Sequence, residues 1–277
     1  MRPLRRSPFI ERTLLKALAV LGGSVYAEGV AAQPGLLQGL DPRFKAISLA
    51  GLIIALLFLK SLPALGLAYA LALGMALASR ISLPAFIART WLFIPVFSLA
   101  IALPALFSTP GPALLRWGPL AVSKTGLMSA ACFVLRVAAA VSFSVLLALT
   151  TRHTELLRAL RCFGLPPLFV MVLGMAYRYI YLMVEVLEQT FRAIKSRVGS
   201  AVEARPGQGL VAWSMASLWA RSYRLNDQVY MAMLSRGYRG EPAPLRGFRA
   251  RARDWAFLGF SALAVALLIR SFPEAQP

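Results

Sequence analysis

The sequence contains very few of the side chains that hydrolytic or metal-dependent catalysis requires. Its 277 residues include one histidine and only 11 aspartates and glutamates in total. That histidine, His153, follows Thr150-Thr151-Arg152 at an expected helix boundary, where a solvated or capping role is much commoner than metal ligation. No apolar segment brings paired carboxylates or imidazoles together, as acid–base or metal chemistry would need. We therefore expect a protein that is not an enzyme, with no catalytic residues, no metal ligands and no cofactor.

Two further absences narrow the function. The only cysteines, Cys132 and Cys162, have no Cys-x-x-Cys spacing, so neither a disulfide framework nor a thiolate metal site is indicated. The sequence also has no Gly-x-x-x-x-Gly-Lys-Ser/Thr loop, the usual cradle for nucleotide phosphates. Any dependence on ATP must therefore be supplied by another subunit.

Charge is scarce and one-sided. Charged residues make up 15% of the chain and hydrophobic residues 58%, whereas soluble domains carry about 25% charged residues. This composition is typical of integral membrane proteins. The net charge is +19, but no RNA-binding or DNA-binding motif accompanies it, so we expect no nucleic-acid partner. Sixteen of the 30 basic residues lie within residues 151–253, and basic segments beside apolar spans mark the cytoplasmic side of a lipid bilayer.

Five apolar stretches are long enough to cross the roughly 30 Å hydrocarbon layer. They are residues 44–59, 64–78, 90–107, 125–149 and 255–269. Asp41 and Pro42 suit the start of the first helix, as N-cap and first-turn residue respectively. With the N-terminus in the cytoplasm, the Arg80/Arg89 loop falls inside, the Gly- and Pro-rich loop 108–124 falls outside, and the C-terminus is external. Every loop then obeys the positive-inside rule.

A sixth apolar stretch, residues 168–184, is excluded from the spans because polar residues follow one face of its helix. That stripe consists of Arg178, Glu185, Glu188, Arg192 and Lys195. A long amphipathic helix from Pro166 to about residue 198 is predicted instead. A second such helix should run over residues 210–234, after a break at 203–207. The two helices end near Ser196-Arg197-Val198 and Ser235-Arg236-Gly237.

The resulting organisation has four parts and an all-α membrane fold. They are an N-terminal interfacial segment (1–43), four spans (44–150), a cytoplasmic region with the two amphipathic helices (151–253), and the last span with a tail (254–277). An amphipathic helix is preferred to a signal peptide near the N-terminus because Lys16 interrupts the apolar run. Arg136 and Arg178 are the ionisable candidates within apolar segments. They could mark a substrate path, and a structural or snorkelling role for Arg136 is the alternative.

The sequence resembles the transmembrane T component of energy-coupling factor (ECF) transporters, in the cobalt/nickel branch known as CbiQ. The resemblance covers nearly the whole chain. The residues that carry it are Gly35-Leu36-Leu37-Gln38-Gly39-Leu40-Asp41-Pro42-Arg43-Phe44-Lys45, Thr125-Gly126-Leu127, Leu135-Arg136-Val137, Thr150-Thr151, Glu155-Leu156-Leu157-Arg158-Ala159-Leu160, Gly164-Leu165-Pro166 and the two arginine tripeptides. A tripeptide alone is a weak signal, but two at the ends of two long helices form a much stronger one.

This resemblance implies that Arg197 and Arg236 each insert into a groove on one of two cytoplasmic ABC-type ATPases. It also implies a separate metal-binding S component, a small accessory membrane subunit, and a location in the bacterial plasma membrane. Ser196 and Val198 replace the alanine and glycine usual in the family, which leaves Arg192 and Arg205 as alternative contacts. Without the resemblance, both tip arginines would be interpreted as complements of the helix dipole.

Other functions remain open at this stage. A T component of the vitamin branch is the nearest alternative, and the Gly35–Arg43 stretch favours the metal branch over it. A passive membrane scaffold would differ only in whether ATPases bind. A membrane enzyme is disfavoured by the missing catalytic groups. The sequence does not separate cobalt from nickel, because this subunit is not expected to contact the ion.

Overall fold

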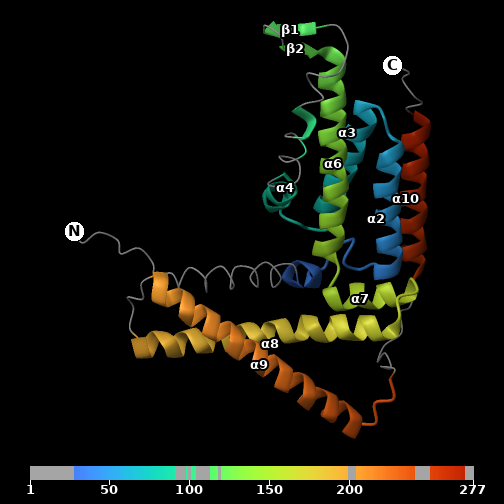
Figure 1. Ribbon diagram of the computed structural model, residues 1–277. Coiled ribbons are helices and arrows are strands. Elements are labelled where there is room, and N and C mark those ends of the chain that lie inside the picture. Colours follow the sequence, from blue (N-terminus) through green and yellow to red (C-terminus); the bar gives the residue numbers. More distant parts are fainter. Residues whose placement is uncertain are drawn as a thin grey trace. The chain divides into compact units, whose positions relative to one another are not determined.

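The computed structural model describes residues 28–91, 98, 101–103, 113–117, 120–198, 204–240 and 250–271 (Figure 1). The chain divides into two compact units. One comprises residues 27–159 together with 247–277, and the other comprises residues 1–26 together with 160–246. The predicted N-terminal interfacial helix lies outside the described residues.

The first unit is a bundle of nearly parallel helices (Figure 1). Its main members are α2 (Pro42–Phe58), α3 (Leu62–Ala78), α6 (Lys124–Thr150) and α10 (Ala252–Ser271). Helix α6 packs against both α2 and α3, and α10 packs against α2. Most of the buried apolar side chains in this unit form one continuous core between these helices.

Small side chains let α3 approach its neighbour closely. Four alanines spaced four residues apart form one face of the helix, and each is at most 1% exposed: Ala64, Ala68, Ala72 and Ala76. Two fully buried alanines of α6, Ala138 and Ala139, belong to the same unit. Helices in a membrane gain little from the hydrophobic effect between them, so close backbone contact through small residues is their main source of packing energy.

The predicted all-α membrane fold is confirmed. Among the described residues, three helices are long and apolar enough to cross a membrane: Lys124–Thr150, Pro167–Ile194 and Ala252–Arg270. The second of them contains residues 168–184, which the sequence analysis excluded from the spans, so by length and composition that stretch does qualify. Helix α3 is apolar but shorter. The predicted spans 44–59, 64–78, 125–149 and 255–269 each coincide with one helix of the bundle. Most of the predicted third span, 90–107, lies outside the described residues. Arg89, expected in a loop, lies in helix α4 (Leu83–Trp91), which begins early because Ser82 and Pro84 form a helix start.

Residues 108–124 contain a feature that the sequence analysis did not anticipate. Strands β1 (Ala113–Trp117) and β2 (Leu120–Ser123) form an antiparallel hairpin in which Trp117 pairs with Leu120. Apolar residues on both sides of Gly118-Pro119 explain the pairing, because such residues favour extended structure and the Gly-Pro pair favours a turn. The described part of the predicted loop, residues 113–117 and 120–123, therefore pairs as two strands ahead of α6.

The second unit contains α8 (Pro167–Val198) and α9 (Ala204–Ser235), which cross near the end of α8 (Figure 1). Phe191 and Ile194 of α8 are buried there, with Leu187 and Val211 packed against them. Helix α9 begins six residues before its predicted start. The prediction treated Pro206 as a break, but proline is well tolerated in the first turn of a helix, where its missing N–H has no partner to lose.

A short helix, α7 (His153–Cys162), precedes α8 and was not predicted as a separate element. Glu155 in its first turn and Arg161 in its last both complement the helix dipole. Its end is closed by Gly164, whose φ of 94° is readily adopted only by glycine. The N–H of Leu165 donates to Leu160 O at 3.4 Å and that of Gly164 donates to Arg161 O at 3.3 Å, which completes a Schellman cap.

Candidate functional site

The second arginine tripeptide forms the C-terminal cap of α9. Gly237 has a φ of 79° and donates its N–H to Leu234 O at 3.0 Å, while Tyr238 donates to Met233 O at 3.0 Å. These two bonds define a Schellman motif with Arg236 as the cap residue. The last carbonyls of α9 are therefore satisfied by backbone groups, without any contribution from the Arg236 side chain.

The first tripeptide lies in the last turn of α8, which ends at Val198. Ser196 donates its hydroxyl to Ala193 O at 2.8 Å, and Ser235 makes the equivalent bond to Ala232 O at 2.9 Å in α9. At both tips the serine thus bonds back to its own helix. The arginine that follows each serine is exposed to solvent.

The side chains of Arg197 and Arg236 make no recorded hydrogen bond or ion pair with the part of the chain that the structure describes. Arg192 differs from them because it pairs with Glu188 four residues earlier. An arginine that served only to neutralise its own helix end would be replaceable by any nearby cation. Two exposed guanidinium groups, each with a full set of donors, are instead suited to donate hydrogen bonds to a partner's carboxylates or carbonyls.

The two tips lie at opposite ends of the helix pair. Helix α9 crosses α8 near the end of α8 and extends for 32 residues, a length of roughly 48 Å at 1.5 Å per residue. Contact between the helices is retained beyond the α9 tip, where the Tyr238 hydroxyl lies 3.2 Å from Met171 Sδ. This geometry allows each tip to contact a different protein.

Helix α9 also carries many exposed apolar side chains. Trp219 is 75% exposed and Trp213 is 61% exposed. Others on the same helix are Met215, Tyr223, Tyr230, Met231 and Leu234. Exposed apolar side chains in this number on one helix mark a contact with another protein or with lipid.

In the bundle, the segment before α2 closes the end of α3. Leu36 N–H donates to Ala78 O at 3.3 Å, and Gln38 Nε2 donates to Ser79 O at 2.9 Å. Gly35 allows this approach, because a Cβ atom there would lie 2.2 Å from Gln38 Oε1 and 2.9 Å from Ser79 O. The first part of the Gly35–Lys45 motif is therefore a helix cap supplied by a neighbouring segment.

Asp41 and Pro42, which the sequence analysis placed at a helix start, occupy that position in α2. The Asp41 side chain accepts from Arg43 N at 3.0 Å, and Pro42 is in the first turn. The Asp41 backbone N–H donates to Asp254 Oδ1 at 2.8 Å, and the other oxygen of Asp254 accepts from Arg251 N at 2.7 Å. Asp254 thus joins the starts of α2 and α10. Pro166, the third predicted helix start, directly precedes α8, and its carbonyl accepts from Phe169 N at 3.1 Å.

Lys45 closes the end of α6. Its side chain is 1% exposed, and Nζ donates to Thr150 O at 2.9 Å and to Thr151 Oγ1 at 3.0 Å. The motif residues Lys45 and Thr150-Thr151, which are about a hundred positions apart in sequence, therefore meet in the fold. From the sequence, Lys45 would be expected to reach lipid head groups, and its buried Nζ shows that this expectation is wrong. Sequence reasoning did not assign roles to Gln38 or Asp254, since nothing local indicates the distant carbonyl or N–H that each would contact.

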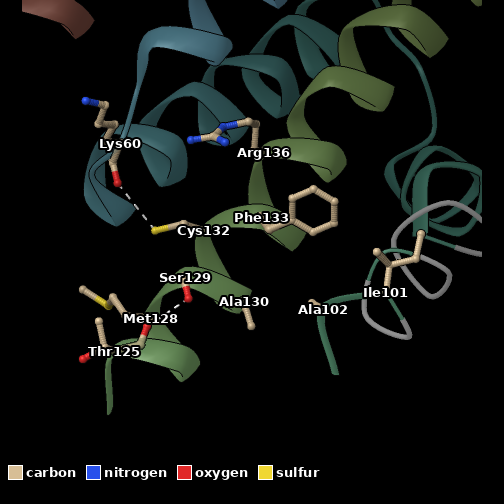
Figure 2. Close-up of a pocket in the computed structure, with 10 residues that line it drawn as sticks. All are labelled: Lys60, Ile101, Ala102, Thr125, Met128, Ser129, Ala130, Cys132, Phe133 and Arg136. Atoms are coloured by element: carbon tan, nitrogen blue, oxygen red, sulfur yellow. Dashed lines mark hydrogen bonds between the residues drawn. The ribbon is translucent and has the colours of Figure 1, made fainter. Parts of the chain in front are cut away.

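Arg136 also caps a helix. Its Nη2 donates to Leu59 O at 2.7 Å, at the end of α2. Figure 2 shows the Arg136 guanidinium on the side of Lys60 and the Phe133 ring on the opposite side of the helix. Both residues line a groove of about 590 Å³. Of the alternatives left open by the sequence, this contact supports the structural role for Arg136. Arg178 is exposed on α8.

No cluster of three or more histidine, cysteine, aspartate or glutamate side chains that could hold a metal ion occurs among the described residues. The features of this molecule that point to a function are thus the two helix tips and the exposed face of α9.

Comparisons with known proteins agree with these features. The family described as cobalt transport protein, CbiQ, matches residues 35–245, which include both helix tips and the Gly35–Lys45 motif. The chain belongs to the EcfT/CbiQ family. A member of this family is a T component, so the chain is a multi-pass membrane protein and a component of an energy-coupling factor transporter.

Three relatives illustrate the range of the family. An uncharacterised protein of Methanocaldococcus jannaschii is 30% identical over 97% of this chain and 94% of its own length. The energy-coupling factor transporter transmembrane protein EcfT of Thermanaerovibrio acidaminovorans is 31% identical over 84% of this chain and 90% of its own length. The nickel permease LarQ of Lactiplantibacillus plantarum is 30% identical over 44% of each chain.

Proposed function

We propose that this chain is the energy-coupling membrane subunit of an ATP-driven cobalt/nickel uptake transporter. The observation that carries the proposal is the pair of exposed arginines, Arg197 and Arg236, at the ends of two long crossed helices. Each arginine would insert into a groove on one of two ABC-type ATPase subunits. ATP hydrolysis would then take place on those partners and not on this chain.

Arginine suits this role because its guanidinium keeps its charge when it is removed from water and offers a planar fork of donors. The Schellman cap at Gly237 fixes where Arg236 leaves the helix, and the Ser196 hydrogen bond does the same for the last turn of α8. A rigid helix pair with its tips at opposite ends could follow two ATPases as they close. The exposed apolar face of α9 would press on a substrate-binding S component and reorient it.

The proposed partners are therefore two ATPase subunits, a metal-binding S component and a small accessory membrane subunit. The proposed location is the bacterial plasma membrane, with the N-terminus in the cytoplasm and the C-terminus outside. The bundle supports this orientation. Hydrogen bonds bring the starts of α2 and α10 and the ends of α3 and α6 to the same end of the bundle. That end carries Arg43, Arg80, Arg152, Arg251 and Arg253. Under the positive-inside rule it faces the cytoplasm.

The choice of cobalt/nickel rests on the matched family, which is described as cobalt transport protein, and on the similarity of part of the chain to a nickel permease. The alternative is a T component that serves vitamin-binding partners. The relatives named EcfT carry no metal in their names, and the protein of T. acidaminovorans covers more of this chain than the nickel permease does. Uptake of radiolabelled cobalt and nickel by cells that express this chain together with its partner subunits would distinguish the two branches.

The coupling role is tested by Arg197→Ala and Arg236→Ala. Loss of a buried, hydrogen-bonded charge pair typically weakens a complex by about 2–5 kcal/mol, so each variant should lose most metal uptake. The double variant should no longer co-purify the ATPases, although it should still insert into the membrane. Lysine at either position should restore only part of the uptake, because an ammonium group lacks the planar fork.

Arg251→Ala and Arg270→Ala provide matched controls, since both arginines are exposed and neither lies at the end of α8 or α9. If the tip variants transport metal and retain ATPases as well as these controls do, the coupling role is wrong. Both arginines would then be interpreted as helix-dipole complements, worth about 0.3–1 kcal/mol each.

A further inference from the structure

The bundle contains a second groove, of about 760 Å³, at the end where α3 finishes and α10 begins. The last turns of α3 form one wall and the first turns of α10 form the other, and the segment 35–40 closes the base. The groove exists because α10 packs against α2 whereas α3 packs against α6, which leaves the two outer helices apart. Its volume falls within the roughly 300–1,000 Å³ of ordinary ligand sites.

The groove is apolar and is kept open by glycine. Leu71 and Phe260 contribute to its walls, and Gly74 lines it on the α3 side. A Cβ atom built at Gly74 would meet nothing within 4 Å, so a larger side chain at this position would enter the groove freely. An apolar groove between two membrane helices is better suited to a hydrocarbon chain than to a polar solute.

One charged side chain lines this groove. Arg253 is the only charged residue in the lining, it is exposed, and no hydrogen bond or ion pair is recorded for it within the described ranges. It lies in the first turn of α10, and lipid head groups are expected beside the first turn of a helix that crosses a membrane. An apolar groove with one arginine in its lining is complementary to a molecule with a hydrocarbon tail and an anionic head group.

We propose that this groove binds one anionic phospholipid, with an acyl chain along the space between α3 and α10 and the phosphate at Arg253. Burial of methylene groups supplies the affinity, which neutral and anionic lipids share. Arg253 supplies the preference for the anionic head group. One basic residue near a charged head group contributes about 1 kcal/mol, which corresponds to a preference of about fivefold. This site is separate from the helix tips and does not depend on the coupling role.

The full chain, purified in mild detergent, would be titrated with phosphatidylglycerol or with phosphatidylcholine of the same acyl chains, and bound lipid would be counted by native mass spectrometry. Phosphatidylglycerol should bind about fivefold more tightly than phosphatidylcholine. Arg253→Gln should abolish that preference, and Gly74→Leu should weaken the binding of both lipids. Arg251→Gln and Gly66→Leu are matched controls that should bind like the wild type, because neither residue lines the groove.

Glycerol 3-phosphate distinguishes a lipid site from a site for a free phosphate group. It carries the head-group charge without the chains, and it should not displace phosphatidylglycerol. The proposal is overturned by equal affinity for the two lipids, by wild-type binding in Gly74→Leu, or by displacement with glycerol 3-phosphate.

Discussion

Replacement of Asp254 by alanine should destabilise the bundle more than the same replacement of an exposed aspartate would. The Asp254 side chain is 2% exposed, and its two oxygens accept from the backbone N–H groups of Asp41 and Arg251 at 2.8 and 2.7 Å. Hydrogen bonds to charged groups contribute about 1.5–3 kcal/mol each, and removal of the carboxylate also leaves both donors without a partner. We therefore expect Asp254→Ala to lower the free energy of unfolding by about 3–5 kcal/mol.

Thermal unfolding of the purified protein in detergent is the measurement. For a unit of this size, a loss of about 3–5 kcal/mol corresponds to a Tm roughly 10 °C lower. Asp254→Asn keeps one acceptor oxygen but turns an amide N–H₂ toward the other donor, so its loss should be about half as large. Asp41→Ala removes an ordinary N-cap bond and should cost about 1 kcal/mol.

Asp227 is exposed on α9, so Asp227→Ala removes a carboxylate without removing a helix cap and serves as the control. The expected order of destabilisation is Asp254→Ala, then Asp41→Ala, then Asp227→Ala. A Tm for Asp254→Ala within about 2 °C of that for Asp227→Ala would refute the inference that this side chain joins the starts of α2 and α10.

Three further changes test the other helix ends by the same unfolding assay. Lys45→Met keeps the length of the side chain but leaves Thr150 O and Thr151 Oγ1 unpaired in a buried position, so it should cost about 2–3 kcal/mol, whereas Lys124→Met at an exposed position should cost little. Gly35→Ala should cost about 1–3 kcal/mol, because the new Cβ atom displaces Gln38 from the end of α3, and Gly29→Ala, with open space around it, should not. Arg80→Gly should raise the free energy of unfolding by about 0.5–1 kcal/mol, because Arg80 has a φ of 55° at the end of α3, and a lower stability would contradict this account.

Several parts of this protein could be predicted from the sequence because their causes are local. Long apolar runs such as those of the bundle are stable against solvent only in lipid. The membrane class and the helices α3, α6 and α10 therefore follow from composition and length. The polar stripe on 178–195 and the glycine after Arg236 are likewise local signals, and they located the long helix α8 and the end of α9. The family resemblance rests on these same short motifs.

Where local signals compete, the predictions failed. Pro206 and Gly207 suggested a break, but a first-turn proline is compatible with a helix, so α9 starts at Ala204. The stretch before α6 contains enough Gly and Pro to suggest an irregular loop, yet the apolar residues around Gly118-Pro119 pair as two strands. Each error arose because two local rules applied to the same residues.

What the sequence determined by itself is the four main helices of the bundle and the two long helices that end near Arg197 and Arg236. What only the tertiary structure decided is which groups close the helix ends. Asp254 lies 213 positions from Asp41 and Lys45 lies 105 positions from Thr150, and yet each pair is in hydrogen-bond contact. No periodicity or propensity reports such contacts, because the unpaired N–H and C=O groups at a helix end can be satisfied by any segment that packing brings close.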